Sequence, residues 1–535
     1  MNLSQFLDHW QIVENPFRGE EARQDTVFVR IGLGGAGSPE SSIPGPESSA
    51  SRAPDTGLRP AVHSDFDKIL GDLSHPSTAI VFGEKGSGKT AIRLQIADRI
   101  ARYNAQHPAA RVLLLPYDDL NAMLDRFHRR VGGKSPSEAF QKFRLVDHID
   151  ALLAGVVPGL IDRLLARSSD SRAAQNGSLD LGPEPRKIAR RLDAAARRDI
   201  LLMQVVYDRP DAADRRTSRV RRLLHFGLPG SFVFWTILAW VGWIPAAVLF
   251  YMAGLKLTTG NITLQTYFFA TLLGLWLLVL GKRFAWDNLA LVGLARRMRR
   301  QIRIQNRSEA SYIRSVRQID PSIRDGVHLP LSDSDEARYA MLDRLKRVLG
   351  AFGYAGLLVI VDRVDEPTLI SGDPDRMRAV IWPLLNNKFL QQDGIGIKLL
   401  LPIELRHALF KESSAFFQEA RLDKQNLVER LSWTGAMLYD LCDARLRACR
   451  VPGAPPISLL DLFAEDVTAK DLVDALDQMH QPRDAFKFLY ACLNEHCSGV
   501  TAEQGQWKVP RLVLEGVKKQ QADRVQQLYR GIRPA

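Results

Sequence analysis

The central part of this 535-residue chain almost completely lacks side-chain charge. Residues 226–255 and 257–281 contain no Asp, Glu, Lys, Arg or His, and only Lys256 lies between them. About 20 mostly apolar residues are enough for a helix to cross the hydrocarbon core of a bilayer. We therefore expect a transmembrane hairpin over residues 223–283. The alternative is a buried helical hairpin of a soluble protein, but such a hairpin rarely lacks charge on every face.

Cysteine is also scarce, which limits redox and metal chemistry. The four cysteines, Cys442, Cys449, Cys492 and Cys497, form no CxxC pair, and this usage is typical of reduced structural thiols. Cys492, His496 and Cys497 would need a fourth ligand at a suitable spacing to hold a metal, and none follows. The N-terminus lacks a basic segment followed by an apolar run, so we expect no cleaved signal peptide.

The net charge of +12 is concentrated in one part of the chain. Residues 215–307 contain 14 Lys or Arg and a single acid, Asp287, so the rest of the chain carries a net charge of about −1. Basic residues flank the apolar segments, where membrane topology selects them, and we expect no nucleic-acid partner. The arginine-rich outer flanks predict that both lie in the cytoplasm, so that the protein is a multi-pass protein of the cell inner membrane.

A glycine-rich segment near residue 85 carries the strongest motif. Its sequence matches GxxxxGK[ST] between a strand predicted at 77–83 and a helix predicted at 89–104; the residues are Gly83, Glu84, Lys85, Gly86, Ser87, Gly88, Lys89 and Thr90. Backbone N–H groups of such a loop wrap phosphates, Lys89 reaches the β and γ phosphates, and the Thr90 hydroxyl binds Mg²⁺. The motif predicts ATP and Mg²⁺ as ligands. The alternative is a glycine turn with an accidental lysine.

Acidic residues follow a second apolar strand, predicted at 356–362. Asp362 ends this strand, where a carboxylate holds Mg²⁺ directly or through water, so Thr90 and Asp362 are the predicted metal ligands. Asp365 and Glu366 follow within one turn, and either one can orient an attacking water. The alternatives are that both are solvated loop acids, or that Arg363 pairs with one of them.

The order of predicted elements indicates an α/β fold with a parallel sheet. Further strands are expected at 110–119 and 396–403, with an edge strand near 425–433. Because two crossings return the chain to the side it left, a hairpin can interrupt one cytoplasmic domain. The expected parts are an N-terminal segment (1–31), a Gly/Pro/Ser-rich flexible linker (32–60), the first half of the domain with a helical insertion (61–222), the hairpin (223–283), the second half (284–450) and a helical C-terminal region (451–535).

These motifs together resemble the KAP P-loop NTPases, which are related to the STAND and AAA+ groups, over about residues 65–495. The resemblance rests on the phosphate loop, the inserted hairpin and the acids spaced D-x-x-D at Asp362 and Asp365. It implies a P-loop NTPase fold with a helical lid and ATP hydrolysis at the cytoplasmic face, and it associates bacterial members with phage exclusion. The chain differs where Arg363 replaces a second acid and Glu366 occupies an often basic position.

Three other segments resemble parts of these ATPases. KLLLPIELR resembles the next strand and implies Glu404 and Arg406 near the γ-phosphate; QPRDAFKFL implies Arg483 as a phosphate sensor. ENPFRGEEARQD resembles segments that touch adenine, with Phe17 as the candidate. The respective alternatives are a surface pair capping a helix, an ordinary helix-start arginine and plain core packing.

Three functions remain open from the sequence. The first is a membrane-anchored ATPase that uses ATP binding and hydrolysis as a conformational switch, as a homo-oligomer or with a partner protein. The second is a weakly hydrolysing nucleotide-binding membrane scaffold. The third is an oligomeric channel or transporter component, although uncharged spans offer no obvious pathway.

Overall fold

The fold is seen in a computed structural model, which describes residues 1–19, 21–32, 62–133, 135–166, 179–227, 230–255, 262–324 and 328–529. The expected linker at 32–60 lies outside these residues, except that Gly32 ends helix α2 (Thr26–Gly32). The turn at 256–261 also lies outside them.

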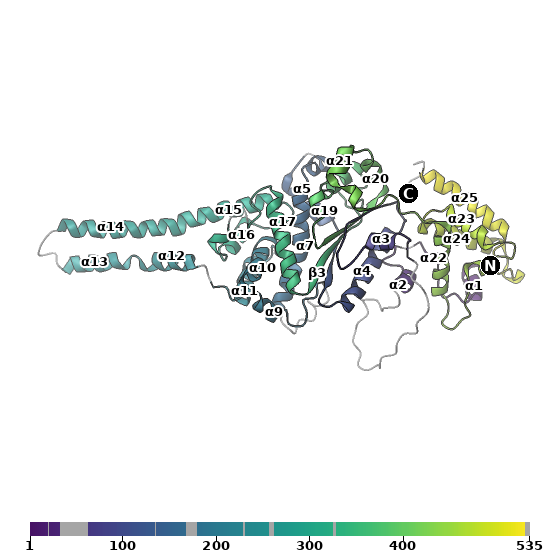
Figure 1. The fold of residues 1–535 in the computed structure, drawn as a ribbon, viewed down its shortest axis with the longest axis horizontal. Helices are drawn as coiled ribbons and strands as arrows, with labels where there is room; N and C mark the ends of the chain where they lie inside the picture. The colour runs from purple at the N-terminus through teal and green to yellow at the C-terminus, as the bar shows by residue number, and fades with distance from the viewer. Residues whose placement is uncertain are drawn as a thin grey trace. The chain divides into compact units, whose positions relative to one another are not determined.

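A five-stranded, all-parallel sheet confirms the predicted α/β fold, and Figure 1 shows it among the helices. The strand order is β2-β3-β4-β1-β5. In register, Ala79 of β1 lies opposite Lys398 of β4 and Asn426 of β5. The predicted edge strand near 425–433 is confirmed as β5, which is only three residues long. The strands are β1 (Ala79–Gly83), β2 (Arg111–Tyr117), β3 (Tyr354–Val361), β4 (Ile395–Pro402) and β5 (Asn426–Val428).

Contacts divide the chain into two compact units. Unit 1 comprises Met1–His107, Leu358–Glu366 and Leu390–Ala535, and unit 2 comprises Pro108–Leu357 and Pro367–Phe389. These boundaries follow packing, so the helical C-terminal region belongs with the N-terminal segment and the glycine-rich loop in unit 1.

A single apolar core joins the two ends of the chain within unit 1. It contains Phe6 and Phe17 from the N-terminal segment together with Leu438, Cys442 and Cys492. Phe17 is 2% exposed, so it packs in this core. The helices of unit 1 are α1 (Leu3–His9), α2, α3 (Phe66–Leu70), α4 (Lys89–Gln106), α20 (Ile403–Leu409), α21 (Ser414–Ala420), α22 (Gly435–Ala448), α23 (Ala469–Asp477), α24 (Pro482–Gly499) and α25 (Arg511–Tyr529).

Unit 2 is mostly helical and contains buried ion pairs. Arg303 donates to Asp147 at 2.6 Å, and Arg338 faces Asp150 at 3.4 Å. Both pairs satisfy charges that burial would otherwise penalise. The helices outside the hairpin include α5 (Asn121–Val131), α6 (Pro136–Phe140), α7 (Leu145–Leu165), α9 (Pro185–Arg191), α10 (Ala194–Tyr207), α11 (Ala213–Leu223), α16 (Glu309–Val316), α17 (Asp335–Ala351) and α18 (Pro374–Ile381).

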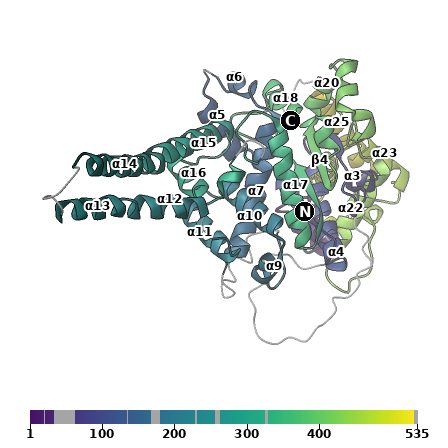
Figure 2. The same cartoon turned by 60° about the vertical axis from the view of Figure 1, so that its left-hand side comes forward.

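The uncharged segments of unit 2 form a long two-armed hairpin, which Figures 1 and 2 draw with its arms alongside each other. The first arm is α12 (Gly230–Val241) and α13 (Ile244–Leu255). It is interrupted before Pro245, whose ring nitrogen cannot donate to a carbonyl of the preceding turn. The second arm is α14 (Ile262–Leu280), a π-helical turn (Gly281–Trp286) and α15 (Asp287–Gln301). The second arm therefore continues to Gln301, 18 residues beyond the expected end of the hairpin at residue 283.

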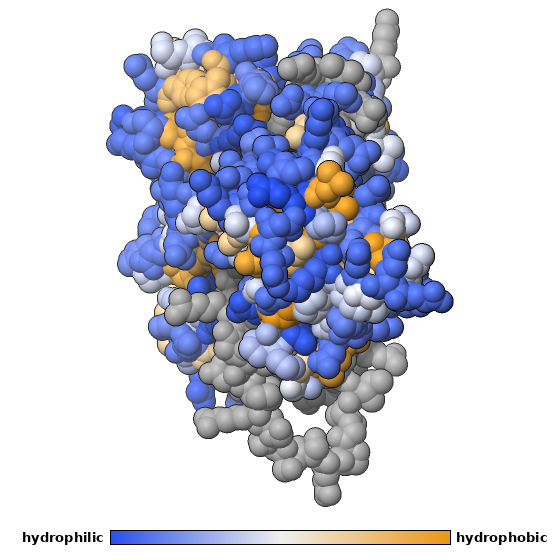
Figure 3. Space-filling view, turned by 90° about the vertical axis from the view of Figure 1, so that its right-hand side faces the viewer, coloured by the Kyte–Doolittle hydropathy of each residue, from blue (hydrophilic) through white to orange (hydrophobic). Residues whose placement is uncertain are grey.

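Both arms contain a helix long and apolar enough to span a membrane, at Val233–Tyr251 and Tyr267–Gln301. The indole N–H of Trp276 donates to the Ala239 carbonyl at 2.9 Å and joins the arms. Many apolar side chains point outward, among them Trp240 and Leu278, each 72% exposed. The face drawn in Figure 3 is, by contrast, mostly hydrophilic, with only separate hydrophobic patches.

Candidate functional site

The glycine-rich loop, residues 83–90, connects the end of β1 to the start of α4 in unit 1. Gly86 and Gly88 have φ angles of +100° and +94°, which side chains disfavour. A Cβ at Gly86 would lie 2.8 Å from Cβ of Arg483, and a Cβ at Gly83 would lie 2.5 Å from Oγ of Ser87. Gly86 and Gly88 are therefore needed for the path of this loop, and a side chain at residue 83 would displace the Ser87 hydroxyl.

Lys89 begins α4 and folds back over the loop. Its ammonium group donates to the carbonyls of Gly83 at 2.7 Å and Glu84 at 2.9 Å. Burial lowers the pKa of Lys89, and the negative charges of Asp362, Asp365, Glu404 and Glu84 oppose that shift. Four predicted site acids are thus close enough to act on one ammonium group. Thr90 follows Lys89 in the first turn of α4, and both residues line the pocket described below.

Asp362 lies directly after β3 and is 1% exposed. Its Oδ1 accepts the backbone N–H of Arg363 at 3.0 Å, and its Oδ2 lies 3.8 Å from Nη1 of Arg93. Arg93 was not predicted from the sequence. Its position four residues after Lys89, on the same face of α4, was the available indication.

Asp365 and Glu366, whose roles the sequence left open, have different partners in the structure. Arg363 has a φ of +59° and forms ion pairs with Glu21 and with Glu366, the latter at 3.4 Å. The alternative that Arg363 pairs with one of the acids is therefore correct for Glu366. Asp365 is half-buried, and its charge acts on Lys89.

Residues from the C-terminal part of the chain contact the glycine-rich loop. Glu84 pairs with Arg430 at 2.7 Å and accepts a hydrogen bond from the side-chain amide of Gln481. Arg483, at the start of α24, lies against Gly86. Arg406 points to Glu429 at 2.9 Å, whereas the charge of its neighbour Glu404 acts on Lys89. Glu404 and Arg406, predicted to lie together, thus interact with different residues.

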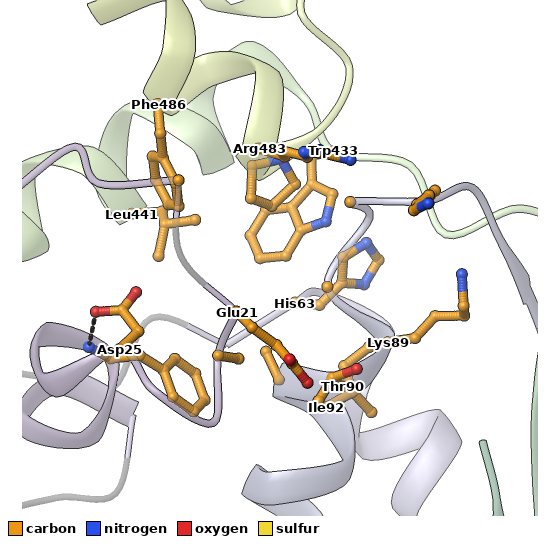
Figure 4. Close-up of a pocket in the computed structure, with 18 of the residues that line it drawn as sticks. Glu21, Asp25, His63, Lys89, Thr90, Ile92, Trp433, Leu441, Arg483 and Phe486 are labelled. Carbon is orange, nitrogen blue, oxygen red and sulfur yellow. Dashed lines mark hydrogen bonds between the residues drawn. The ribbon is translucent and has the colours of Figure 1, made fainter. Parts of the chain in front are cut away.

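A pocket of about 420 Å³ lies within unit 1 beside the loop. Figure 4 shows Lys89 and Thr90 below Arg483, with Leu441 and Phe486 toward the opposite end. The lining residues at the loop are Lys85, Gly86, Gly88, Lys89, Thr90 and Arg483. The apolar lining residues are Ala22, Phe28, Ile92, Leu441 and Phe486, of which Ile92 lies beside Thr90 in Figure 4. Arg363 and Glu366 also line it, whereas Phe17 does not.

Two aromatic residues of the pocket were missed by the sequence reasoning. The indole N–H of Trp433 donates to the Ser87 carbonyl at 2.9 Å, and its ring lies edge-on to His63 at 4.9 Å. His63 also contacts the Ser432 carbonyl at 2.9 Å. No motif identifies either residue, because their roles depend on packing between distant segments.

The N-terminal segment lines the pocket with Glu21, Ala22, Asp25 and Phe28. Asp25 forms a buried ion pair with Arg445 at 2.7 Å, and Arg445 also donates to the Pro16 carbonyl at 2.6 Å. These contacts hold Ala22 and Phe28 among the apolar lining residues.

No protein-family model matches the chain, and neither a curated protein nor a solved structure matches it. The assignment of function therefore depends on the site itself.

Proposed function

We propose that this chain is a membrane-anchored ATPase of the P-loop NTPase class, similar to the KAP family, that uses ATP binding and hydrolysis as a conformational switch. The observation that carries the proposal is the loop at residues 83–90. It joins a buried strand to a helix N-terminus, has two glycines at positive φ, and places Lys89 among acids. A helix N-terminus of this kind favours phosphate groups through its N–H groups and its dipole.

The pocket suits a nucleoside triphosphate. Its volume lies within the range of small-molecule sites. Lysine, arginine and loop N–H groups at one end suit phosphates, and aliphatic and aromatic side chains at the other suit a base. In parallel α/β sheets, ligands bind at the carboxyl ends of strands where the strand order reverses direction. In the order β2-β3-β4-β1-β5 the chain leaves β1 toward β2 on one side and leaves β4 toward β5 on the other, so β1 borders such a reversal.

The residues present also fit Mg²⁺. This ion prefers hard oxygen ligands, and Thr90 and Asp362 supply a hydroxyl and a carboxylate. When bound, Mg²⁺ would neutralise charge on the phosphate oxygens. Asp365 is the favoured group for orienting water, since Arg363 engages Glu366. Glu404, whose charge also reaches Lys89, is the next candidate.

We further propose that the hairpin anchors the protein in the cell inner membrane with both units in the cytoplasm. Exposed apolar side chains along both arms and the basic residues at their cytoplasmic ends support this orientation. A switch of this kind works on a partner protein or within a homo-oligomer. The resemblance to KAP proteins makes phage defence the first biological role to examine.

One observation favours a weakly hydrolysing scaffold as the second candidate. Arg93 lies 3.8 Å from Oδ2 of Asp362, the carboxylate expected to position the metal. A scaffold of this kind would bind ATP but turn it over slowly. Turnover therefore distinguishes the two functions better than binding does.

The test is ATP binding and Mg²⁺-dependent phosphate release by the purified full chain, compared with Lys89→Ala. Loss of a charge-assisted contact to phosphate predicts a fall in ATP affinity of roughly 10- to 100-fold. Lys411→Ala, at an exposed lysine of unit 1, is the matched control and keeps parental affinity. Parental binding by Lys89→Ala would refute the site. Binding without release in the parent protein would favour the scaffold.

A further inference from the structure

We propose that helix α11 carries a binding surface for anionic phospholipid headgroups, formed by Arg215, Arg219 and Arg222. These three residues are called the arginine stripe below. The inference rests on the proposed insertion of the hairpin into a membrane, and it adds a lipid preference that anchoring alone does not require.

The stripe lies on one face of α11. Its members are spaced by four and three residues, which places them on neighbouring turns, and all three are exposed. The neighbouring side of α11 is neutralised internally, because Arg216 pairs with Asp208 and Asp162, each at 2.8 Å. Within the described part of the chain, no carboxylate forms an ion pair with the stripe. Its charge is therefore available to an external anion.

Contacts within unit 2 place the stripe near the root of the hairpin. Lys282 lies over the ring of Trp235 at 3.5 Å, and Arg283 donates to Thr236 at 3.1 Å, so charged residues begin at this level. Slightly farther along the second arm, Arg317 donates to Asn288 at 2.7 Å. The next residue, Gln318, accepts from Ser218 of α11 at 2.9 Å. Figures 1 and 2 both draw α11 near the start of α12.

This level matches the depth of lipid headgroups. Asn288 lies six residues beyond Lys282, or about 9 Å along a helix. The headgroup layer extends roughly 5–8 Å beyond the hydrocarbon on each side, and arginine side chains reach several ångströms farther. Trp286, 71% exposed between these two residues, is also suited to the membrane interface.

Two exposed arginines farther along the second arm serve as a comparison for the arginine stripe. Arg297 and Arg300 on α15 are exposed, and no carboxylate among the described residues pairs with them. They lie 15 and 18 residues beyond Lys282, or about 22–27 Å along the helix. That distance exceeds the Debye length of about 8 Å at physiological salt. These two arginines should contribute little to headgroup binding.

The test uses the full chain in nanodiscs of phosphatidylcholine containing a minor fraction of phosphatidylglycerol, without nucleotide. Spin-labelled lipids report the preference of the protein for the anionic lipid. The double variant Arg219→Gln/Arg222→Gln should reduce this preference by roughly fivefold per arginine. Arg297→Gln/Arg300→Gln should change it less than twofold. High salt should weaken the parental preference more than that of the α11 variant, which keeps Arg215.

Equal losses in the two double variants, or a properly inserted parent protein with no anionic preference, would overturn the proposal. Retention of RNA by the stripe in discs of pure phosphatidylcholine, without lipid selectivity, would assign the surface to nucleic acid instead. Failure of the chain to enter nanodiscs would contradict the membrane anchor itself. ATP hydrolysis in detergent tests the proposed enzyme separately, so the two failures are distinguishable.

Discussion

Asp365 and Glu366 are neighbours in the sequence with different surroundings in the fold. Glu366 is engaged by Arg363, which also binds Glu21 of the N-terminal segment. Asp365 is half-buried, and its charge acts on Lys89 at the start of α4. The two acids should therefore respond differently to the same chemical change.

We expect Asp365→Asn to keep ATP affinity and to slow single-turnover hydrolysis by about 10² or more, the scale of one positioned acid–base group. Glu366→Gln should instead reduce ATP affinity and turnover together by a few-fold, because Arg363 loses one of its two carboxylate partners beside the pocket. Equilibrium ATP binding and single-turnover rates separate the two effects. Parental rates in both variants would remove both acids from the reaction and make Glu404→Gln the next variant to measure.

Lys398 gives a pH-dependent prediction that is independent of ligands. It lies fully buried in β4, its ammonium group donates to the Ser77 carbonyl at 2.7 Å, and burial lowers its pKa to about 7. The unfolded chain, with an ordinary lysine pKa near 10.4, then binds more protons than the folded chain between pH 7 and 10. This term increases folding stability as the pH rises through that window.

Lys398→Met should remove that term. From pH 7 to pH 9, the stability of the parent protein should rise relative to the variant by on the order of 2 kcal/mol. Denaturant unfolding of the two proteins at several pH values measures the difference. Parallel stability curves would show that Lys398 remains charged in the folded state.

At the scale of elements, the pocket and the hairpin belong to different units. All residues that line the pocket are in unit 1, whereas both arms are in unit 2. The hydrogen bond between Arg283 and Thr236 shows that the arms are adjacent at their root. A short linker can therefore replace the hairpin without pulling the flanking helices apart.

Replacing residues 230–286 by a short Gly/Ser linker should give a soluble protein that binds ATP with parental affinity. Size-exclusion chromatography and thermal unfolding establish that the variant is folded, and nucleotide titration measures the affinity. The same deletion with Lys89→Ala is the control for specific binding. A folded variant that cannot bind ATP would show that the hairpin is needed to form the site.

At the scale of the whole molecule, the proposed membrane anchor predicts how the protein fractionates. Carbonate washing removes peripheral proteins but leaves membrane-spanning helices in place. We expect the full chain to remain in the pellet after this treatment and the hairpin-deleted variant to appear in the supernatant. Trypsin added to spheroplasts should spare both units, because the positive-inside rule places them in the cytoplasm. Release of the full chain, or its cleavage from outside, would contradict this topology.

Local patterns in the sequence were sufficient for several elements. The eight residues from Gly83 to Thr90 are contiguous, so their motif predicts the loop between β1 and α4 without knowledge of any distant contact. The central strands and the two apolar helical arms were also predictable, because continuous apolar runs of different length indicate buried strands and long helices. The short edge strand β5 was also anticipated, although not its length.

Only the tertiary structure decided which distant residues surround the loop. Trp433 contacts Ser87, Arg483 contacts Gly86, and Glu21, Ala22, Asp25 and Phe28 line the pocket, across separations that no local pattern encodes. The sequence also could not decide whether Arg363 pairs with Asp365 or Glu366, because both acids lie within three residues of it. Packing settles such choices, because the conformations of side chains and loops depend on all neighbouring elements at once.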